Sequence, residues 1–430
     1  MLFLLGCGPL PDLSDSHRDL SDSLPVFPGA QGFGTDTVAG RGGEVLIVDT
    51  LAASGPGSLA EALATPGPRT VLFEVAGVIR LEENLSIQEP FLTLAGQSAP
   101  PPGITLAGAG LVVNTHDVLI QHLAIRPGGD ASGPAPENRD AIAIIGVPSG
   151  DLPVYNVVVD HVSLSWSVDE QFSTWYPGVR DVTLSYALIS EALNESVHPE
   201  GAHSKALLVG DHTRRVSVHH SVLAHNHDRN PISKGDSSAL FSNLLVYNPG
   251  RWPVTLFDQE RSGPTLMALQ ECLFIPGADT PLDHSTVLID RSAKDGTQVY
   301  LRALSSWDDG GVEVLGRRDE VLVEDIPVSV TPLLTEANAG LLQTLPNQVG
   351  SRPAQRDPVD TRVIQELADG EGRIIDRVAD VGGWAALESM GTRQQVLVLP
   401  EDPSGDRDSN GYTNLEEWLH DLAAELEAQN

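Results

Sequence analysis

Two short segments of this chain carry side chains that could act on an acidic substrate. The protein has 23 arginines and only three lysines, and Lys205 and Lys234 stand in the segments 203–210 and 229–235. The ammonium group of lysine is more compact than guanidinium, and its pKa shifts more readily. Lysines kept in an arginine-rich chain therefore suggest that one of these properties is needed there. The two lysines thus predict a cationic patch rather than chance retention on a solvated surface.

The elements that would position this patch recur along the chain as short apolar strands. Their starts are spaced by 39, 25, 34 and 24 residues, at Val118, Val157, Val182, Val216 and Leu240. A shortest spacing near 24, with longer insertions, indicates one rung per turn of a solenoid. β-Branched strands without alternating helices favour a parallel β-helix. Outward side chains on adjacent rungs would then form an extended binding face that suits a linear polymer.

Composition narrows the class of partner. The chain has 430 residues, 41% of them hydrophobic, and a formal net charge of −33. Such acidity argues against nucleic acid and against general attraction to an anionic membrane surface. A polyanionic substrate would need a local cationic groove, which screening within about 8–10 Å makes sufficient. Seven of the 13 histidines lie between His198 and His227, but their spacing lacks the pattern of a transition-metal site.

We expect three parts in the chain: a signal and tether segment at 1–25, a β-helix at 26–399 and a small tail at 400–430. The apolar run before Cys7 is similar to the end of a lipoprotein signal, although the usual basic start is missing. This predicts a secreted or cell-surface protein with a lipid anchor at Cys7. Two cysteines are too few for a disulfide framework, and we expect a monomer.

A set of motifs in fixed order carries a family resemblance. The segments are 27–34, 40–45, 54–59, 159–161, 203–210, 218–220, 229–235 and 356–384. In this order the chain resembles bacterial pectate lyases of the first polysaccharide lyase family. The resemblance implies a right-handed parallel β-helix that cleaves polygalacturonate by calcium-dependent β-elimination, giving unsaturated oligogalacturonides.

The same resemblance implies a set of calcium ligands. The matching positions are Asn138, Asp140, Asp169 and Ser173, and Glu170 could add a carboxylate. Calcium suits this reaction because it takes oxygen ligands and neutralises the uronate carboxylate that opposes removal of the C5 proton. Two of the four matched residues are carboxylates, so we expect the ion to bind weakly without substrate.

The resemblance also implies the roles of the cationic residues. Arg229 matches the family's base, Lys205 the residue that holds the substrate carboxylate, and Lys234 the residue that closes the patch. Because guanidinium is a weak base at ordinary pH, Lys205 as base with Arg229 stabilising the developing charge stays open. A non-catalytic polysaccharide-binding β-helix and a calcium-independent pectin lyase also stay open. A hydrolase is disfavoured because no pair of carboxylates aligns with Lys205 and Arg229 in the sequence.

The tail contains a second calcium pattern. Asp406, Asp408 and Asn410 occupy loop positions one, three and five, a glycine follows at six, and Glu417 stands at twelve. Tyr412, at position seven, would contribute its carbonyl. This is the arrangement of a helix–loop calcium site, and it predicts a structural calcium clip next to a terminal helix.

Overall fold

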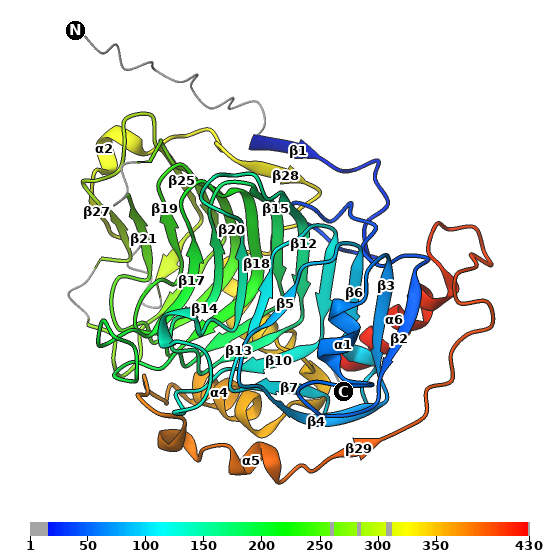
Figure 1. Cartoon of the computed structure of the whole chain (residues 1–430). Coiled ribbons are helices and arrows are strands. Elements are labelled where there is room, and N and C mark those ends of the chain that lie inside the picture. The colour runs from blue at the N-terminus through cyan, green and yellow to red at the C-terminus, as the bar shows by residue number, and fades with distance from the viewer. Residues whose placement is uncertain (1–15, 259–261, 282–284, 307–311, 429–430) are drawn as a thin grey trace, which may run out of the picture.

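The computed structural model describes residues 16–258, 262–281, 285–306 and 312–428 (Figure 1). Cys7, the expected lipidation site, lies outside these residues. Within them, no helix combines the length and the apolar character needed to cross a membrane. The segment expected to be a tether contains a paired strand, β1 (His17–Asp19), which lies parallel to β28 (Ser329–Thr331). Residues 17–19 therefore belong to a two-stranded sheet.

The chain winds through three stacks of parallel strands, as the sequence predicts for a parallel β-helix (Figure 1). The first stack comprises β2 (Glu44–Val48), β3 (Arg69–Phe73), β6 (Leu92–Ala95), β9 (Val118–Gln121), β12 (Val154–Asp160), β15 (Val179–Ser185), β18 (Arg214–Ala224), β20 (Ser238–Tyr247), β22 (Leu266–Gln270) and β25 (Gln298–Arg302). The second comprises β4 (Val75–Arg80), β7 (Ile104–Ala107), β10 (Leu123–Arg126), β13 (Ser163–Ser165), β16 (Leu188–Ser190), β23 (Leu273–Ile275) and β26 (Ser305–Ser306), joined by the long strands β18 and β20.

The third stack is a separate nine-stranded sheet that carries the candidate site. It comprises β5 (Leu85–Ile87), β8 (Leu111–Val113), β11 (Ile142–Ile145), β14 (Glu170–Trp175), β17 (Lys205–Val209), β19 (Ile232–Lys234), β21 (Val254–Phe257), β24 (Val287–Ile289) and β27 (Val314–Gly316). The short strand β29 (Arg393–Gln394) differs from the stacks because it pairs antiparallel with β4.

Rung register agrees with the sequence spacing in four of the five copies. Val157 pairs with Val118 and Val182, and Val182 pairs with Val216. The fifth copy is displaced by one residue, because Val216 pairs with Ala239 rather than Leu240. A one-residue shift reverses the face of every side chain. Leu240 accordingly packs in a separate cluster outside the coil, while its neighbours Ala239 and Phe241 fill the interior.

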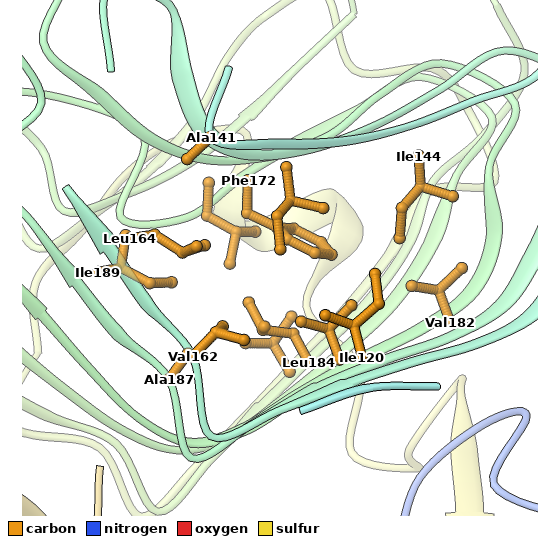
Figure 2. Close-up of a cluster of buried hydrophobic side chains, with 14 of the residues drawn as sticks. Ile120, Ala141, Ile144, Val162, Leu164, Phe172, Val182, Leu184, Ala187 and Ile189 are labelled. Carbon is orange, nitrogen blue, oxygen red and sulfur yellow. The ribbon is translucent and has the colours of Figure 1, made fainter. Parts of the chain in front are cut away.

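Apolar side chains from all three stacks meet inside the coil (Figure 2). Ile120, Val182 and Leu184 come from the first stack, Leu164 and Ile189 from the second, and Ile144 and Phe172 from the third, all fully buried. Burying a side chain of this size contributes about 1.5–3 kcal/mol. Because each rung contacts its neighbours, the core is continuous along the axis.

A row of rings marks the bend between the first and second stacks. His122, His161, Tyr186 and His220 take left-handed backbone conformations there, with φ of 57°, 48°, 49° and 49°. The centroids of successive rings lie 5.2, 4.8 and 5.1 Å apart, and each pair is stacked. Each coil thus places one ring in the same corner. We call this row the corner stack.

The N-terminal motif covers the outer face of the first stack. The main-chain N–H of Phe33 donates to Ser217 Oγ at 2.9 Å, and Thr183 Oγ1 donates to the Phe33 carbonyl at 2.7 Å. Gly32 has a φ of 113°, and a Cβ added there would meet Thr183 Oγ1 at 2.3 Å. Only glycine allows this close approach, which explains why the motif carries it.

The α-helices are α1 (Leu59–Ala64), α2 (Arg318–Val321), α3 (Leu341–Thr344), α4 (Pro358–Asp369), α5 (Ala385–Glu388) and α6 (Asn414–Glu427). The helices labelled α1, α2, α4, α5 and α6 lie around the strand stacks (Figure 1). The 3₁₀ turns are η2 (Gly96–Ser98), η3 (Pro136–Asn138), η4 (Asn338–Gly340), η5 (Leu345–Asn347), η6 (Pro353–Gln355) and η7 (Val378–Val381).

Two of these helices are fastened to the β-helix. The N-cap of α4 is Asp357, and a buried ion cluster joins its first turn to the second stack, with Arg126 Nη2 lying 2.9 Å from Asp357 and 2.7 Å from Asp360. Helix α6 begins with a capping box between Thr413 and Glu416. Its Leu415 and Leu419 pack against Leu72 and Ala95 of the first stack. The chain end therefore packs on the body of the solenoid.

Candidate active site

The expected cationic residues come from neighbouring rungs of the third stack. Lys205 is the first residue of β17 and Lys234 is the last residue of β19. Arg229 lies in the turn before β19, with a left-handed φ of 60°. Glu170, the first residue of β14, pairs in register with Lys205. The solenoid therefore brings Glu170, Lys205 and Arg229 together, although they lie up to 59 positions apart in the sequence. Lys234 follows Ser233, which pairs with Val209, so it lies five residues farther along the strands than Lys205 and not beside Glu170.

Three carboxylates gather beside this patch. The ligand oxygens of Asp140, Asp169 and Glu170 all lie within 4.8 Å of one another. Ser173 Oγ donates a hydrogen bond to Asp140. Loss of hydration raises the pKa of Asp140 well above its usual range, and the charge of Asp169 raises it further. We call these three carboxylates with Ser173 the acidic group.

Arg229 joins the acidic group to the cationic patch. Its guanidinium forms an ion pair with Glu170, whose side chain is 5% exposed. Burial lowers the pKa of Arg229, while the charges of Asp169 and Asp140 oppose that shift. A buried guanidinium loses its proton more readily than one in water, so this environment favours the family's base. The contact with Glu170 favours the protonated form instead.

Each lysine has its own carboxylate partner. Lys205 Nζ lies 3.1 Å from Asp228 Oδ2, and Lys234 Nζ lies 3.8 Å from Asp211 Oδ2. Lys234 Nζ also stands 4.4 Å from the centroid of the Trp175 ring, a cation–π contact. Sequence reasoning missed Asp228 and Asp211 as partners. The position of Asp228 immediately before Arg229 was the available signal.

His203 holds Asp169 in place. Its Nε2–H donates to Asp169 Oδ1 at 2.9 Å, and its ring stacks on that of His198 with centroids 3.6 Å apart. Main-chain N–H groups of Val168 and Asp169 also donate to the carbonyl of Arg139. A carboxylate fixed in this way needs little reorganisation to bind a ligand. His203 was predicted only as part of a motif, and its contact with Asp169 could not be read from spacing.

The acidic group fits a calcium ion. Its donors are all oxygen atoms, which calcium prefers. Loss of hydration, followed by the charge of Asp169, raises the pKa of Asp140, and a bound divalent cation would stabilise the ionised carboxylate. Asn138, the other expected ligand, is exposed in η3, where its main-chain carbonyl accepts from Asn84 Nδ2 at 2.8 Å. The group thus contains three carboxylates and a hydroxyl, since Glu170 joins the matched pair.

The expectation that no carboxylates align with the cationic residues is wrong. Glu170 pairs in register with Lys205 and contacts Arg229, and two further carboxylates lie within 4.8 Å of it. The sequence hid this because Glu170 and Lys205 lie 35 residues apart, and their pairing depends on the rung register. Carboxylate content therefore does not separate a lyase from a hydrolase in this chain.

The C-terminal loop brings its expected side chains into contact through Asn410. Asn410 Nδ2 donates to Asp408 Oδ2 at 3.1 Å and to Glu417 Oε1 at 3.0 Å. The main-chain N–H of Asn410 donates to Asp406 Oδ1 at 3.2 Å, and that of Tyr412 to Asn410 Oδ1 at 2.8 Å. The loop is compact and mostly exposed, and it leads directly into α6.

Comparison with known proteins decides the family. No protein-family model matches the chain. A probable pectate lyase C from Aspergillus flavus is 31% identical over 432 residues, covering 94% of this chain and 95% of that protein. The chain belongs to the pectate lyase family. A probable pectate lyase C from Aspergillus oryzae has the same identity and coverage. A plant relative, pectate lyase 5 of Ambrosia artemisiifolia, is 31% identical over 174 residues, which is 37% of this chain and 40% of that protein.

Solved structures support the fold of this family member. The cedar pollen allergen jun a 1 superposes with a TM-score of 0.55 and 16% identity, covering 73% of this chain and 90% of that one. A Bacillus subtilis pectate lyase variant gives 0.53 and 12%, covering 76% and 98%. A pectate lyase bound to a hexasaccharide gives 0.54 and 13%, covering 75% and 97%. As a member of the pectate lyase family, the chain is a polysaccharide lyase.

Proposed function

We propose that this lyase cleaves polygalacturonate by calcium-dependent β-elimination and releases unsaturated oligogalacturonides. The observation that carries the proposal is the contact of Arg229, in the turn before β19, with Glu170 of the acidic group on β14, across the intervening strand β17. Oxygen donors for a cation and a basic side chain then border the same stretch of the third stack. A uronate substrate needs both, because its carboxylate must be neutralised while its C5 proton is removed.

Asp140, Asp169, Glu170 and Ser173 would hold the calcium ion. When bound, the ion would neutralise a substrate carboxylate and acidify the neighbouring C5–H bond. Lys205, which faces Asp228 and lies level with Glu170, has the charge and position to bind a substrate carboxylate beside the acidic group. Lys234, which faces Asp211 farther along the strands, would bind a carboxylate of another residue of the polymer. The two lysines thus orient the uronide through charge-assisted hydrogen bonds.

Arg229 is the better candidate for the base. Burial already lowers the pKa of Arg229, and its partner Glu170 is also a member of the acidic group. If Glu170 shared its charge with a cation, it would stabilise the charged guanidinium less. This would favour the neutral form of Arg229, which is the form that can accept the C5 proton. The alternative, Lys205 as base, leaves Arg229 to stabilise the carboxylate-centred charge that develops.

The activity test compares two polymers with and without calcium. The chain is incubated with polygalacturonate and with highly methylated pectin, each with calcium or a chelator, and unsaturated uronides are followed by ultraviolet absorbance. We expect product from polygalacturonate only with calcium. Chelator-resistant cleavage of methylated pectin would assign the protein as a pectin lyase. No unsaturated product from either polymer would favour the polysaccharide-binding alternative. The lipid anchor at Cys7, secretion and the monomeric state stay predictions.

A further inference from the structure

A second cluster of ligand-type side chains lies on the first two stacks, where the C-terminal helix ends. His122 and His161 occupy the same corner on successive coils, with rings stacked 5.2 Å apart. Glu427, the last residue of α6, reaches this corner. One donor atom from each of the three residues lies within 4.8 Å of the other two. None of them belongs to the acidic group of the third stack.

The state of His122 is the most informative feature of this cluster. The side chain is fully buried, and its Nδ1 lies 2.9 Å from the carbonyl oxygen of Ser351. A carbonyl accepts, so Nδ1 carries a proton. Nε2 has no hydrogen-bond partner among the described residues, yet it stands 3.4 Å from Glu427 Oε1. A ring nitrogen this close to a carboxylate needs a cation between them, which is either a proton on Nε2 or a metal ion.

His161 presents a second nitrogen to the same oxygen. Its Nδ1 lies 3.5 Å from Glu427 Oε1 and 2.9 Å from Asp160 Oδ2. The ring also hydrogen-bonds to the main chain of Gln348. Asp160 is held in turn by Ser185, whose Oγ donates to Oδ1 at 2.7 Å. A metal ion at Nδ1 would replace the proton that otherwise bonds to Asp160, and the carboxylate of Asp160 would balance its charge.

The spacing fits a small tetrahedral ion. Ligand atoms at about 2.0–2.1 Å from tetrahedral zinc lie roughly 3.3–3.4 Å from one another. The two measured separations, from His122 Nε2 and His161 Nδ1 to Glu427 Oε1, are 3.4 and 3.5 Å. Two imidazoles and a carboxylate are ligands for zinc and similar first-row ions, whereas calcium prefers oxygen alone.

The site has an entrance. A cavity of about 600 Å³ opens between α6 and the corner, and its lining includes Asp160, His161, Tyr186, His420 and Glu427. Ions and water can therefore reach the open side of the cluster, where a fourth ligand would bind.

We propose that His122, His161 and Glu427 form a binding site for Zn²⁺ or a similar first-row divalent ion, distinct from the calcium sites. The ion joins two coils of the solenoid to the end of α6 and so fastens the C-terminal helix. The competing arrangement is a protonated His161 that pairs with both carboxylates, and it predicts no specific zinc binding.

The test is a calorimetric titration of the full chain with zinc chloride after chelator treatment, in buffer with excess calcium to fill the oxygen sites. We expect one zinc equivalent to be lost, or weakened at least about tenfold, in Glu427→Gln. Glu425→Gln changes an exposed residue two positions earlier and should bind zinc as the wild type does. His203→Gln should also keep this equivalent, which separates it from the group of Asp169, His198 and His203.

Hydrogen exchange gives a second readout that does not depend on activity. Zinc should slow amide exchange in α6 of the wild type and of Glu425→Gln, but not of Glu427→Gln. His122→Gln should behave like Glu427→Gln if it folds. If it does not fold, the result for Glu427→Gln decides the question, because that residue is partly exposed. Equal zinc stoichiometry and affinity in the wild type and Glu427→Gln, or no zinc binding by the wild type, would overturn the proposal.

Discussion

His203 Nε2 donates to Asp169 Oδ1 at 2.9 Å and so fixes the carboxylate of the acidic group that lies beside the stacked rings of His198 and His203. Outer partners of this kind orient a ligand without touching substrate. His203 is therefore a positioning residue for the proposed calcium site.

His203→Gln should raise the calcium concentration needed for half-maximal activity by about 10–100-fold, because Asp169 loses its fixed orientation. Activity at saturating calcium should largely return, and the circular dichroism spectrum should not change. The measurement is a calcium titration of uronide release. A variant with the wild-type calcium requirement would show that His203 serves only packing.

Removing Arg229 should affect both catalysis and stability. Arg229→Ala should lower turnover by about 10²–10⁴-fold, the scale of a positioned base. It also leaves buried Glu170 without its ion-pair partner, which costs about 3–5 kcal/mol in comparable buried pairs. The contact with Glu170 therefore gives Arg229 a structural role in addition to its proposed catalytic role.

Lys205→Ala is the matched comparison. Its partner Asp228 is 14% exposed and can be hydrated, so turnover should fall while the melting temperature changes little. Calcium should restore the melting temperature of Arg229→Ala but not its turnover. Equal and parallel losses of stability and activity in both variants would mean that both residues are structural.

The two proposed calcium sites should separate by mutation. Glu417→Gln should remove calcium binding in the absence of substrate, because Glu417 would be the bidentate ligand of the proposed C-terminal site. It should spare most activity. Asp169→Asn should abolish turnover and leave the loop site intact. Calorimetric calcium titration paired with the uronide assay measures both. Similar loss of activity in the two variants would contradict a division into structural and catalytic sites.

Buried histidines should make the fold sensitive to acid. Burial, with a smaller effect of His219, lowers the pKa of His220 to about 3, and burial lowers that of His225 to about 4. Their folded-state pKa lies below the ordinary value of 6.5, so their contribution is complete above pH 6.5 and is lost as pH falls towards the folded-state pKa. Each should reduce the free energy of unfolding by about 2–3 kcal/mol between pH 6.5 and 4.5.

His220→Asn should reduce the change in the free energy of unfolding with pH by the contribution of one histidine. Asparagine is chosen because it accepts the left-handed backbone at that corner. Chemical denaturation at pH 7.5, 6 and 4.5 measures it. His17→Asn, at an exposed position, is the control and should leave the slope unchanged. An unaltered slope in His220→Asn would show that another group controls the acid sensitivity.

The β-helix could be predicted from the sequence, but the side-chain contacts in its turns could not. The alternation of β-branched residues predicts the rung register. This prediction failed at Leu240, because Leu240 and Ala239 are both apolar and either could face inward. The proximity of Glu170 to Lys205 follows from that register. The pairing of Arg229 with Glu170 does not, because it depends on a left-handed turn residue whose direction no pattern encodes. The proximity of His122 and His161 also follows from the register, because they occupy the same position in successive copies that begin at Val118 and Val157. The approach of Glu427 to them does not, because it depends on how α6 packs on the solenoid.

The corner stack has a consequence for how this lyase can change over evolution. Beyond that corner, the connections between the second and third stacks span 127–141, 166–169 and 191–204 in successive coils, and each returns to the same register. These connections carry or border Asp140, Asp169 and His203. Their length can therefore vary while one ring per coil keeps the winding in phase. New substrate preferences can arise by insertion or deletion in these loops, without a change in the strand register of the solenoid.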